Sequence, residues 1–303
     1  MNNNQHFNRF AIITNPSKEE IELVKKGLEE HNKKHPNGEL DIPTPDISLI
    51  LKNKDGQIIG GVITSMLVGV MHLEVLWVAK KHRRKGYGRA LVLEAERIGK
   101  KKGYTASQTW TFSFQAPEFY QSIGYKVLGI FDGYIGGITE YVLMKRLDTN
   151  HHTLHEANRQ EKAEFLISED SSEKSMNVLH TGLQEYVKEH IDELRKKNPG
   201  IQINLIIKNE TGQLIGGING SSILKALYID QLWIDERYRG QGYGKELMMA
   251  AETIAKKDGC ISSLAMVYSF QFPEFFQKLG YETFGVSDGY PKPIKEYYFI
   301  KKY

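Results

Sequence analysis

An apolar strand runs directly into a helix through the stretch Trp77-Val78-Ala79-Lys80-Lys81-His82-Arg83-Arg84-Lys85-Gly86-Tyr87-Gly88-Arg89. Glycines at the start of a helix let the backbone approach a ligand closely. The unpaired N–H groups of a first helical turn, together with the positive end of the helix dipole, bind anions such as phosphate. Basic side chains on the same turn add charge-assisted hydrogen bonds. The stretch therefore predicts a phosphate-binding loop.

The same pattern returns 156 residues later as Trp233-Ile234-Asp235-Glu236-Arg237-Tyr238-Arg239-Gly240-Gln241-Gly242-Tyr243-Gly244-Lys245. From Asp55, which matches Thr211, the chain matches itself to its last residue without a gap, and roughly two positions in five are identical. A period this long indicates a duplicated domain rather than a solenoid. A polar run follows Leu147, so we expect a first domain at 1–148, a linker at 149–162 and a second domain at 163–303.

Composition narrows the class of protein. Of 303 residues, 40% are hydrophobic and 25% are charged, which is typical of a globular chain. A net charge of +3 does not indicate nucleic acid or membrane as a partner. The apolar stretch 58–79 is interrupted by Gly60-Gly61, Gly69, His72 and Glu74, so it predicts two strands rather than a membrane span.

Cysteine and histidine usage gives no metal site. The single cysteine, Cys260, excludes an intrachain disulfide, and together with an N-terminus that has no apolar leader it predicts a cytoplasmic protein. His151 and His155 would share a helix face and could ligate a metal, but no third ligand lies nearby in the sequence. A solvated linker is the favoured interpretation of these histidines.

The order of elements predicts a mixed α/β fold, with α+β character and a strongly bent sheet. In each copy a short strand (10–14; 164–168) precedes a helix (18–34; 172–197). Strands follow in the first copy at 47–52, 57–67 and 70–79, with a Lys-Asp-Gly turn at 54–56. A helix then runs from the Gly-Tyr-Gly element to a C-terminal stop at Gly103 or Gly259. A strand, a short helix after Pro117 or Pro273, and two closing strands complete each copy.

The loop motif has a specific resemblance. The Rossmann fingerprint lacks its third glycine here, and no Gly-Lys-Ser/Thr follows, as a Walker A loop requires. A basic run at 80–85 allows nucleic-acid binding, but the second copy does not keep it. Instead, Arg83-x-x-Gly86-x-Gly88 and Arg239-x-x-Gly242-x-Gly244 resemble the pyrophosphate loop of the GNAT superfamily of N-acetyltransferases.

The resemblance covers nearly all of both copies, more loosely in the first helix of each. The segments Ala116-Pro117-Glu118-Phe119-Tyr120-Gln121-Ser122-Ile123-Gly124-Tyr125 and Phe272-Pro273-Glu274-Phe275-Phe276-Gln277-Lys278-Leu279-Gly280-Tyr281 resemble the penultimate helix and following strand of small bacterial members. Those members usually continue with Tyr-Pro-x-Gly-His. Tyr134-Ile135-Gly136-Gly137-Ile138 and Tyr290-Pro291-Lys292-Pro293-Ile294 depart from that element and lack its histidine.

The resemblance implies acetyl-CoA as cosubstrate and no metal. The pantetheine arm would pair with the backbone of the fourth strand, and the pyrophosphate would lie on the amides of the loop. The implied binding residues are Leu76, Trp77, Val78, Arg83, Arg84, Lys85, Gly86, Tyr87, Gly88, Arg89 and Ser113 in the first copy, and Leu232, Trp233, Ile234, Arg239, Gly240, Gln241, Gly242, Tyr243, Gly244, Lys245 and Ser269 in the second. Ser113 and Ser269 have a second interpretation as strand-end or helix caps.

Catalytic roles follow from the chemistry of amine acylation. An alkylamine with a pKa near ~10.4 must lose a proton before it attacks a thioester, and Glu74 or Asp230 could accept it, unless these carboxylates only form surface pairs. A backbone N–H of Val78 or Ile234 could bind the oxyanion. The family's proton donor to the departing thiolate is a tyrosine, which corresponds to Tyr120; the second copy has Phe276 there. Without that resemblance, a tyrosine on an apolar helix face such as Tyr120 is more often a core residue than a catalyst.

The acceptor site has weaker signals. Asp132, Tyr134, Asp288 and Tyr290 could line a pocket for a cationic amine, or could instead reflect Asp-Gly turn chemistry. The leading hypothesis is an N-acetyltransferase for a small-molecule or peptide amine, with the first copy as the better catalyst. The alternative is an acyl-CoA-binding or interaction module in the second copy or in both. The sequence is also compatible with another acyl donor, and with either a monomer or a homodimer.

Overall fold

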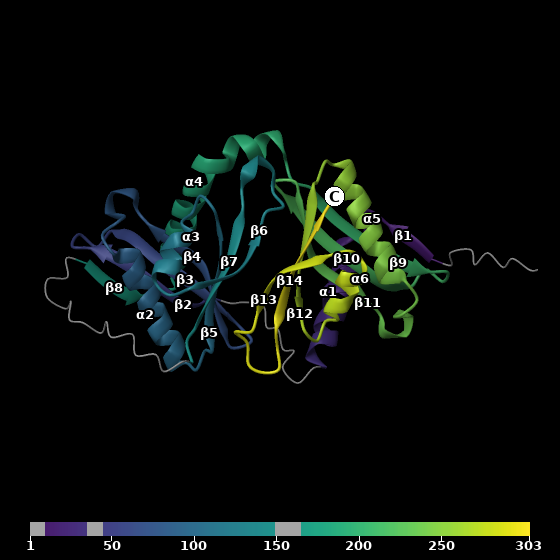
Figure 1. The fold of residues 1–303 in the computed structure, drawn as a ribbon, viewed down its shortest axis with the longest axis horizontal. Coiled ribbons are helices and arrows are strands. Elements are labelled where there is room, and N and C mark those ends of the chain that lie inside the picture. The colour runs from purple at the N-terminus through teal and green to yellow at the C-terminus, as the bar shows by residue number, and fades with distance from the viewer. Residues whose placement is uncertain (1–9, 35–44, 149–164) are drawn as a thin grey trace, which may run out of the picture.

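The computed structural model describes residues 10–34, 45–148 and 165–303. Two seven-stranded mixed sheets lie side by side (Figure 1). The first sheet has the order β6-β7-β5-β4-β3-β2-β8 and the second the order β1-β9-β10-β11-β12-β14-β13. The predicted α/β class with two similar units is confirmed. His151, His155 and the predicted linker 149–162 lie outside the described residues.

The strands of the first sheet are β2 (Pro45–Asn53), β3 (Ile58–Leu67), β4 (Val70–Val78), β5 (Ala106–Phe112), β6 (Lys126–Phe131), β7 (Glu140–Arg146) and β8 (Phe165–Glu169). Its helices are η1 (Lys80–His82), α2 (Tyr87–Lys101), α3 (Pro117–Ser122), η2 (Ile135–Gly137) and α4 (Glu173–Lys197). The strands of the second sheet are β1 (Phe10–Ile13), β9 (Gln202–Asn209), β10 (Leu214–Ile223), β11 (Ala226–Ile234), β12 (Ser262–Tyr268), β13 (Glu282–Ser287) and β14 (Glu296–Lys302). Its helices are α1 (Lys18–Lys33), η3 (Glu236–Tyr238), α5 (Tyr243–Lys257) and α6 (Pro273–Lys278).

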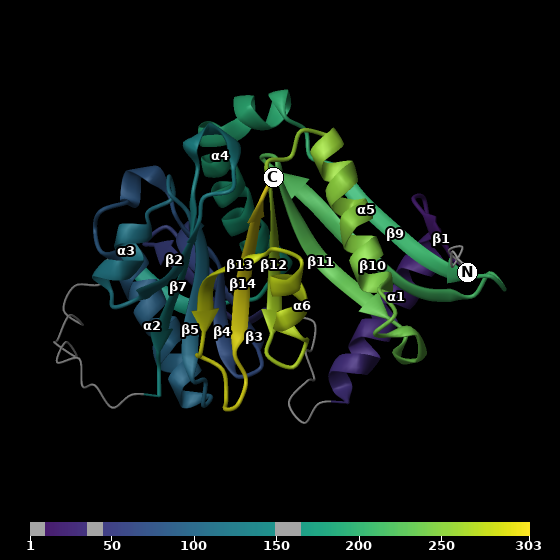
Figure 2. The same cartoon turned by 45° about the vertical axis from the view of Figure 1, so that its right-hand side comes forward.

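The two copies exchange their first strand and helix. β1, from the first copy, pairs antiparallel with β9 of the second, and β8, from the second copy, pairs antiparallel with β2 of the first. In Figures 1 and 2 the purple β1 and α1 accordingly lie with the green strands of the second sheet. The division 1–148 and 163–303 therefore separates two repeats of the sequence, whereas each sheet contains residues from both repeats.

Helices cover both faces of each sheet. In the first sheet, Leu49 packs with Leu91 of α2, whereas its neighbour Ile50 packs with Leu179 of α4. Successive strand residues point to opposite faces, so α2 and α4 lie on opposite sides of the sheet. The second sheet lies in the same way between α5 and α1.

Glycine in the third strand of each copy lets the exchanged helix come close. A Cβ at Gly61 would lie 2.6 Å from Leu179 of α4, and one at Gly217 would lie 2.5 Å from Val24 of α1. Both distances are far below van der Waals contact. The repeated Gly-Gly pair thus provides room for a helix that comes from the other copy.

The two sheets meet along their edge strands. A Cβ on Gly129 of β6 would lie 2.6 Å from the carbonyl oxygen of Phe284 in β13, and a Cβ on Gly285 would lie 2.9 Å from that of Leu128. Two apolar clusters flank this contact, one around Phe131 and Leu264 and one around Val70 and Tyr290. The interface is therefore built from equivalent positions of the two copies. Among the described residues, no helix is long and apolar enough to span a membrane.

Candidate active site

Each sheet opens where its two central parallel strands diverge. β4 pairs with β5 only from Val70 to His72, although β4 continues to Val78. In the second sheet, β11 pairs with β12 only from Ala226 to Ile229 and continues to Ile234. Beyond these points β4 and β11 keep strand pairing on one side alone. The predicted binding segments 76–78 and 232–234 lie in these open stretches.

A β-bulge stands at the opening of each pair of strands. Glu74 has no opposite residue in β3, because Leu73 pairs with Thr64 and Val75 with Ile63. Asp230 occupies the same place in β11. Bulges re-aim side chains and occur often beside active sites. Both residues keep solvent-exposed surface and line the cleft of their sheet. The surrounding protein removes part of the water around the Asp230 carboxylate, which raises its pKa above the ordinary value. Glu74 accepts a hydrogen bond from Ser65 Oγ at 2.5 Å.

The predicted phosphate loops have open amides. α2 begins after Gly86 and α5 after Gly242, both in the left-handed region, with φ of 88° and 91°. Neither helix has a side-chain cap at this position, in contrast to α1, where Ser17 and Glu20 form a capping box. Backbone N–H groups at a helix start that no cap side chain engages can bind an anion. The loop also turns through a left-handed residue at Arg84 and at Gly240.

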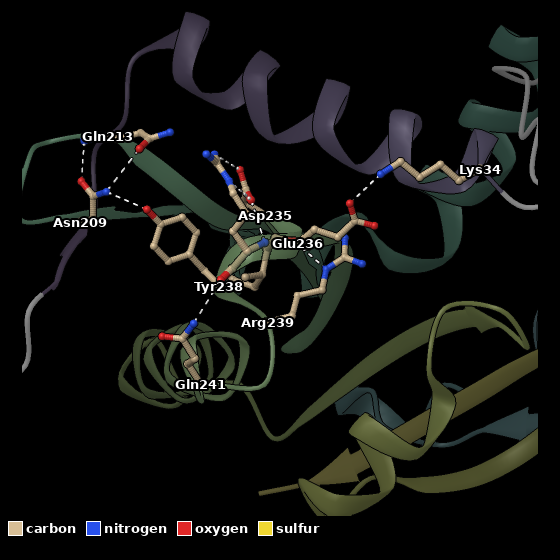
Figure 3. Close-up of polar contacts among 10 residues, drawn as sticks. Lys34, Asn209, Gln213, Asp235, Glu236, Tyr238, Arg239 and Gln241 are labelled. Carbon is tan, nitrogen blue, oxygen red and sulfur yellow. Dashed lines mark hydrogen bonds and ion pairs between the residues drawn. The ribbon is translucent and has the colours of Figure 1, made fainter.

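An arginine ties each loop to the end of its open strand. Arg83 Nε donates to the carbonyl oxygen of Val78 at 2.8 Å, and Arg239 Nε donates to that of Ile234 at 2.9 Å. Arg239 is drawn among the polar contacts of the second loop in Figure 3. The first residue of each Arg-x-x-Gly-x-Gly motif therefore links the loop to the backbone at the mouth of the cleft.

A cavity of about 560 Å³ is lined by the open strand and the loop of the first sheet, and one of about 500 Å³ by those of the second. Of the predicted residues, the first cleft contains Glu74, Leu76, Trp77, Val78, Arg83, Arg84, Gly86, Tyr87, Gly88, Arg89 and Tyr120. The second contains Asp230, Leu232, Trp233, Ile234, Arg239, Gly240, Gly242, Tyr243, Gly244 and Lys245. Lys85 and Gln241 belong to the loops but do not line the clefts.

The floors of the two clefts differ in polarity. The first is lined by Tyr120, Thr109 and Thr111, whereas the second has Phe276, Ala265 and Val267 at the matching positions. Burial raises the pKa of Tyr120 to about 12, against a smaller opposing effect of a hydrogen bond with Thr109. The phenol is therefore protonated at neutral pH.

Several predicted residues lie away from the clefts. Ser113 Oγ accepts from the N–H of Thr139 at 3.3 Å, and Ser269 Oγ accepts from that of Lys295 at 3.2 Å, so both tie a loop to the closing strands. Asp132 pairs with Lys302 at 2.7 Å, and the Asp288 carbonyl accepts from Arg146 at 2.8 Å.

Tyr134 and Tyr290 lie at the interface of the sheets. Tyr134 donates to Glu140 at 2.6 Å, and Tyr290 donates to Glu296 at 2.8 Å. Both carboxyl groups are buried, and burial raises the pKa of Glu140 to about 8. Each cluster also receives a side chain of the other sheet, Tyr228 at Glu140 and Gln108 at Glu296. These tyrosines contribute to the contact between sheets rather than to the walls of the clefts.

Sequence reasoning missed one wall of each cleft. Leu183 and Tyr186 of α4 line the first cleft, and Leu28 and His31 of α1 line the second. Each pair comes from the other copy of the sequence. The sequence predicts both helices, at 18–34 and 172–197, but not the sheet on which each packs. Among the described residues no group of three or more metal-ligating side chains is found.

Comparison with known proteins places this geometry in a family. The model of the acetyltransferase (GNAT) family matches residues 17–125 and 164–281. The chain is 36% identical over 94 residues to a blasticidin-S acetyltransferase of Streptomyces morookaense, covering 31% of this chain and 69% of that protein. An acetyltransferase structure from Bacillus cereus is 35% identical, with a TM-score of 0.42, over 45% of this chain and 96% of that one. The PaiA N-acetyltransferase of Thermoplasma acidophilum in complex with coenzyme A is 24% identical, with a TM-score of 0.31, over 44% of this chain and 80% of that one.

Proposed function

Because the chain belongs to the acetyltransferase (GNAT) family, we propose that it transfers the acetyl group of acetyl-CoA to a primary amine and that the first cleft is the more active of the two. One observation carries the proposal: in both sheets, uncapped helix amides lie beside a central strand that has lost its parallel neighbour. Such amides suit a diphosphate, and the open strand edge suits an amide-rich pantetheine arm.

The residues of the first cleft fit the requirements of acyl transfer. Glu74 is exposed within the cleft and can accept a proton from the acceptor ammonium, directly or through one water. Tyr120 lies on the floor of the same cleft, on α3, and its phenol is protonated, as a donor to a departing thiolate must be. The loop amides after Gly86 and the side chains of Arg84 and Arg89 supply positive charge for a diphosphate.

Two details of the loop support a ligand at this place. Arg84 has φ of 62°, a backbone conformation that costs a non-glycine residue about 1 kcal/mol, and its side chain lines the cleft. The second copy has Gly240 there, with φ of 73° and no such cost. At Gly88, a Cβ would lie 3.5 Å from Phe119 and 4.0 Å from Leu76, so a larger side chain would fill the cleft between loop and strand.

A second function is favoured for the second cleft. Its floor has Phe276 and Ala265 where the first has Tyr120 and Thr109, so the position equivalent to Tyr120 has no phenol to protonate a leaving group. Its loop and open strand are retained. The second cleft therefore fits binding of acetyl-CoA or a related acyl-CoA with slow turnover or none.

The acceptor is proposed to be a small-molecule amine. Support comes from the exposed carboxylate of Glu74 in the first cleft and from the similarity to a protein named as a blasticidin-S acetyltransferase. A peptide amine is the competing acceptor, and the same assay separates the two.

The test is thiol release from acetyl-CoA by the full chain, with a panel of amines that includes blasticidin S, polyamines and short peptides. The variants are Gly88→Glu and Gly244→Glu, which place a carboxylate on the first turn of each helix, where it repels a diphosphate but favours the helix dipole. Gly88→Glu should abolish amine-dependent release, and Gly244→Glu should retain most of it. The reverse order, or release that neither variant affects, contradicts the proposal.

A further inference from the structure

The exchanged helix α4 touches both walls of the first cleft. The ring of Tyr186 lies under the guanidinium of Arg83, 4.7 Å from Cζ to the ring centroid. The Tyr186 hydroxyl donates to the carbonyl oxygen of Phe114 at 2.8 Å, in the loop between β5 and α3. One side chain thus connects the phosphate loop to the opposite wall.

Helix α1 makes the matching contacts in the second cleft. His31 Nδ1 lies 3.3 Å from Arg239 Nη1, and the His31 ring stacks on Phe272 at 6.2 Å between centroids. One turn further, Lys34 reaches Glu236 of η3 at 2.7 Å, as Figure 3 shows. Asn32 accepts from Gln271 at 3.0 Å, in the loop before α6. In both clefts the exchanged helix thus contacts the loop arginine and the opposite wall, through a ring face in the first cleft and a ring nitrogen in the second.

The glycines of these helices show that α4 and α1 pack on equivalent open strands. A Cβ on Gly182 of α4 would lie 2.2 Å from the Trp77 ring, and one on Gly27 of α1 would lie 2.3 Å from the Trp233 ring. Tyr186 and His31 each follow four residues later, which is the same helix face one turn on. Each helix therefore rests on the open strand and reaches the loop arginine from the same direction.

Each loop arginine has two kinds of partner. Its Nε is used by the carbonyl at the end of the open strand. The Arg83 guanidinium also lies over the Tyr186 ring, whereas Arg239 Nη1 lies 3.3 Å from His31 Nδ1. Arg is suited to such double contacts, because its planar fork donates in several directions and its face can stack on a ring. A cation within about 6 Å of an aromatic face is attracted by the ring quadrupole.

We infer that Tyr186 and His31 are positioning residues, each holding the loop arginine of the opposite copy in the orientation that binds the diphosphate of acetyl-CoA. The inference rests on the proposed function. It adds that neither copy of the sequence supplies a complete cosubstrate site by itself. The first copy depends on α4 and the second on α1, so the two clefts must be built together.

The experiment titrates the full chain with acetyl-CoA in variants in which only one cleft can still bind acetyl-CoA. In the Gly244→Glu background, Tyr186→Leu should weaken binding about five- to tenfold, as loss of a cation–π contact predicts. Tyr186→Phe keeps the ring and should change affinity less than about twofold. His31→Leu is the matched control and should have no effect in this background. In the Gly88→Glu background the roles of Tyr186→Leu and His31→Leu are exchanged.

A double-mutant cycle separates positioning from a general structural effect. If Tyr186 acts through Arg83, Tyr186→Leu should have no further effect on affinity once Arg83→Leu is present. Full additivity would overturn the inference, as would unchanged affinity in Tyr186→Leu while the background still binds acetyl-CoA. Absence of acetyl-CoA binding in both single-cleft backgrounds and in the unmodified chain would instead refute the proposed function.

Discussion

Tyr120 in the first copy and its counterpart Phe276 in the second differ by one oxygen atom, that of the tyrosine hydroxyl. Tyr120 and Phe276 lie on equivalent short helices, line equivalent clefts and pack against equivalent aromatic neighbours. The polar partner has changed with the hydroxyl, since Thr109 in the first cleft corresponds to Ala265 in the second. The difference in polarity therefore includes a second residue of the cleft floor. This is expected if proton transfer takes place only in the first cleft.

Tyr120→Phe tests this role. The variant should lower turnover about 100-fold, the usual contribution of a general acid, and should leave the affinity for acetyl-CoA within about twofold. Steady-state kinetics together with a binding titration give both quantities. Phe276→Tyr in the second cleft is the control for packing and should not lower turnover. Undiminished turnover in Tyr120→Phe would remove the phenol from the mechanism.

Glu140 gives the protein a stability that depends on pH. Its pKa of about 8 in the folded state lies above that of an ordinary glutamate, near ~4.3, so the folded protein binds a proton that the unfolded chain has released. Stability should therefore fall as pH rises from about 4.3 to 8, by up to about 1.4 kcal/mol per pH unit from this group.

The measurement is denaturant unfolding at pH 6 and pH 8. Glu140→Gln keeps the size of the side chain and cannot ionise, so the loss of stability between the two pH values should be smaller in this variant than in the unmodified chain. Glu29→Gln, at an exposed position of α1, is the control and should change nothing. An equal loss in all three proteins would show that Glu140 does not titrate in this range.

Among single residues, those of the loop motifs could be predicted and those of the interface could not. Spacing and residue type identify Arg83, Gly86 and Gly88, because backbone requirements near a phosphate leave a pattern in the sequence. Asp132 and Tyr134 carry acidic and aromatic groups that would suit an amine pocket as well as they suit the contact between the sheets. Their position at the contact between sheets depends on long-range packing, for which the local sequence has no signal.

At the scale of elements, helix α4 packs on the first sheet through a glycine contact that leaves no room for a methyl group. The Gly182 Cα faces the Trp77 ring so closely that a Cβ would lie 2.2 Å from it, and Trp77 belongs to the open strand of the first cleft. Overpacking of this kind costs about 1–3 kcal/mol.

Gly182→Ala should therefore weaken acetyl-CoA binding in the first cleft about tenfold and leave the second cleft unchanged, although residue 182 lies in the second copy of the sequence. Gly27→Ala, its counterpart on α1, should show the opposite selectivity. Titrations in the Gly244→Glu and Gly88→Glu backgrounds distinguish the clefts. An effect of Gly182→Ala confined to the second cleft would mean that each copy folds on itself.

Most elements were predictable, and their partners were not. The strands at 47–52, 57–67 and 70–79 and both loop helices appear as expected, because alternation and capping are local signals. A short strand such as β1 has the same pattern whether it pairs with β2 or with β9. Since the two copies are similar, both pairings offer nearly the same edge, and the choice between them depends on the connection and the interface.

At the scale of the whole molecule, the exchange and the interface join the two clefts into one structure. β6 and β13 meet through paired glycines, and the clusters around Glu140 and Glu296 each contain side chains of both sheets. Single-domain chains can obtain such an interface only by association of two copies. Here the repeat supplies both partners within one chain, with one cleft free to diverge at its floor while the loops are retained.

If both uncapped loops bind the diphosphate of acetyl-CoA, isothermal titration of the full, unmodified chain with acetyl-CoA should show saturable binding of two molecules per chain. Absence of saturable binding at acetyl-CoA concentrations up to about 1 mM, the upper end of ordinary substrate affinities, would contradict this expectation.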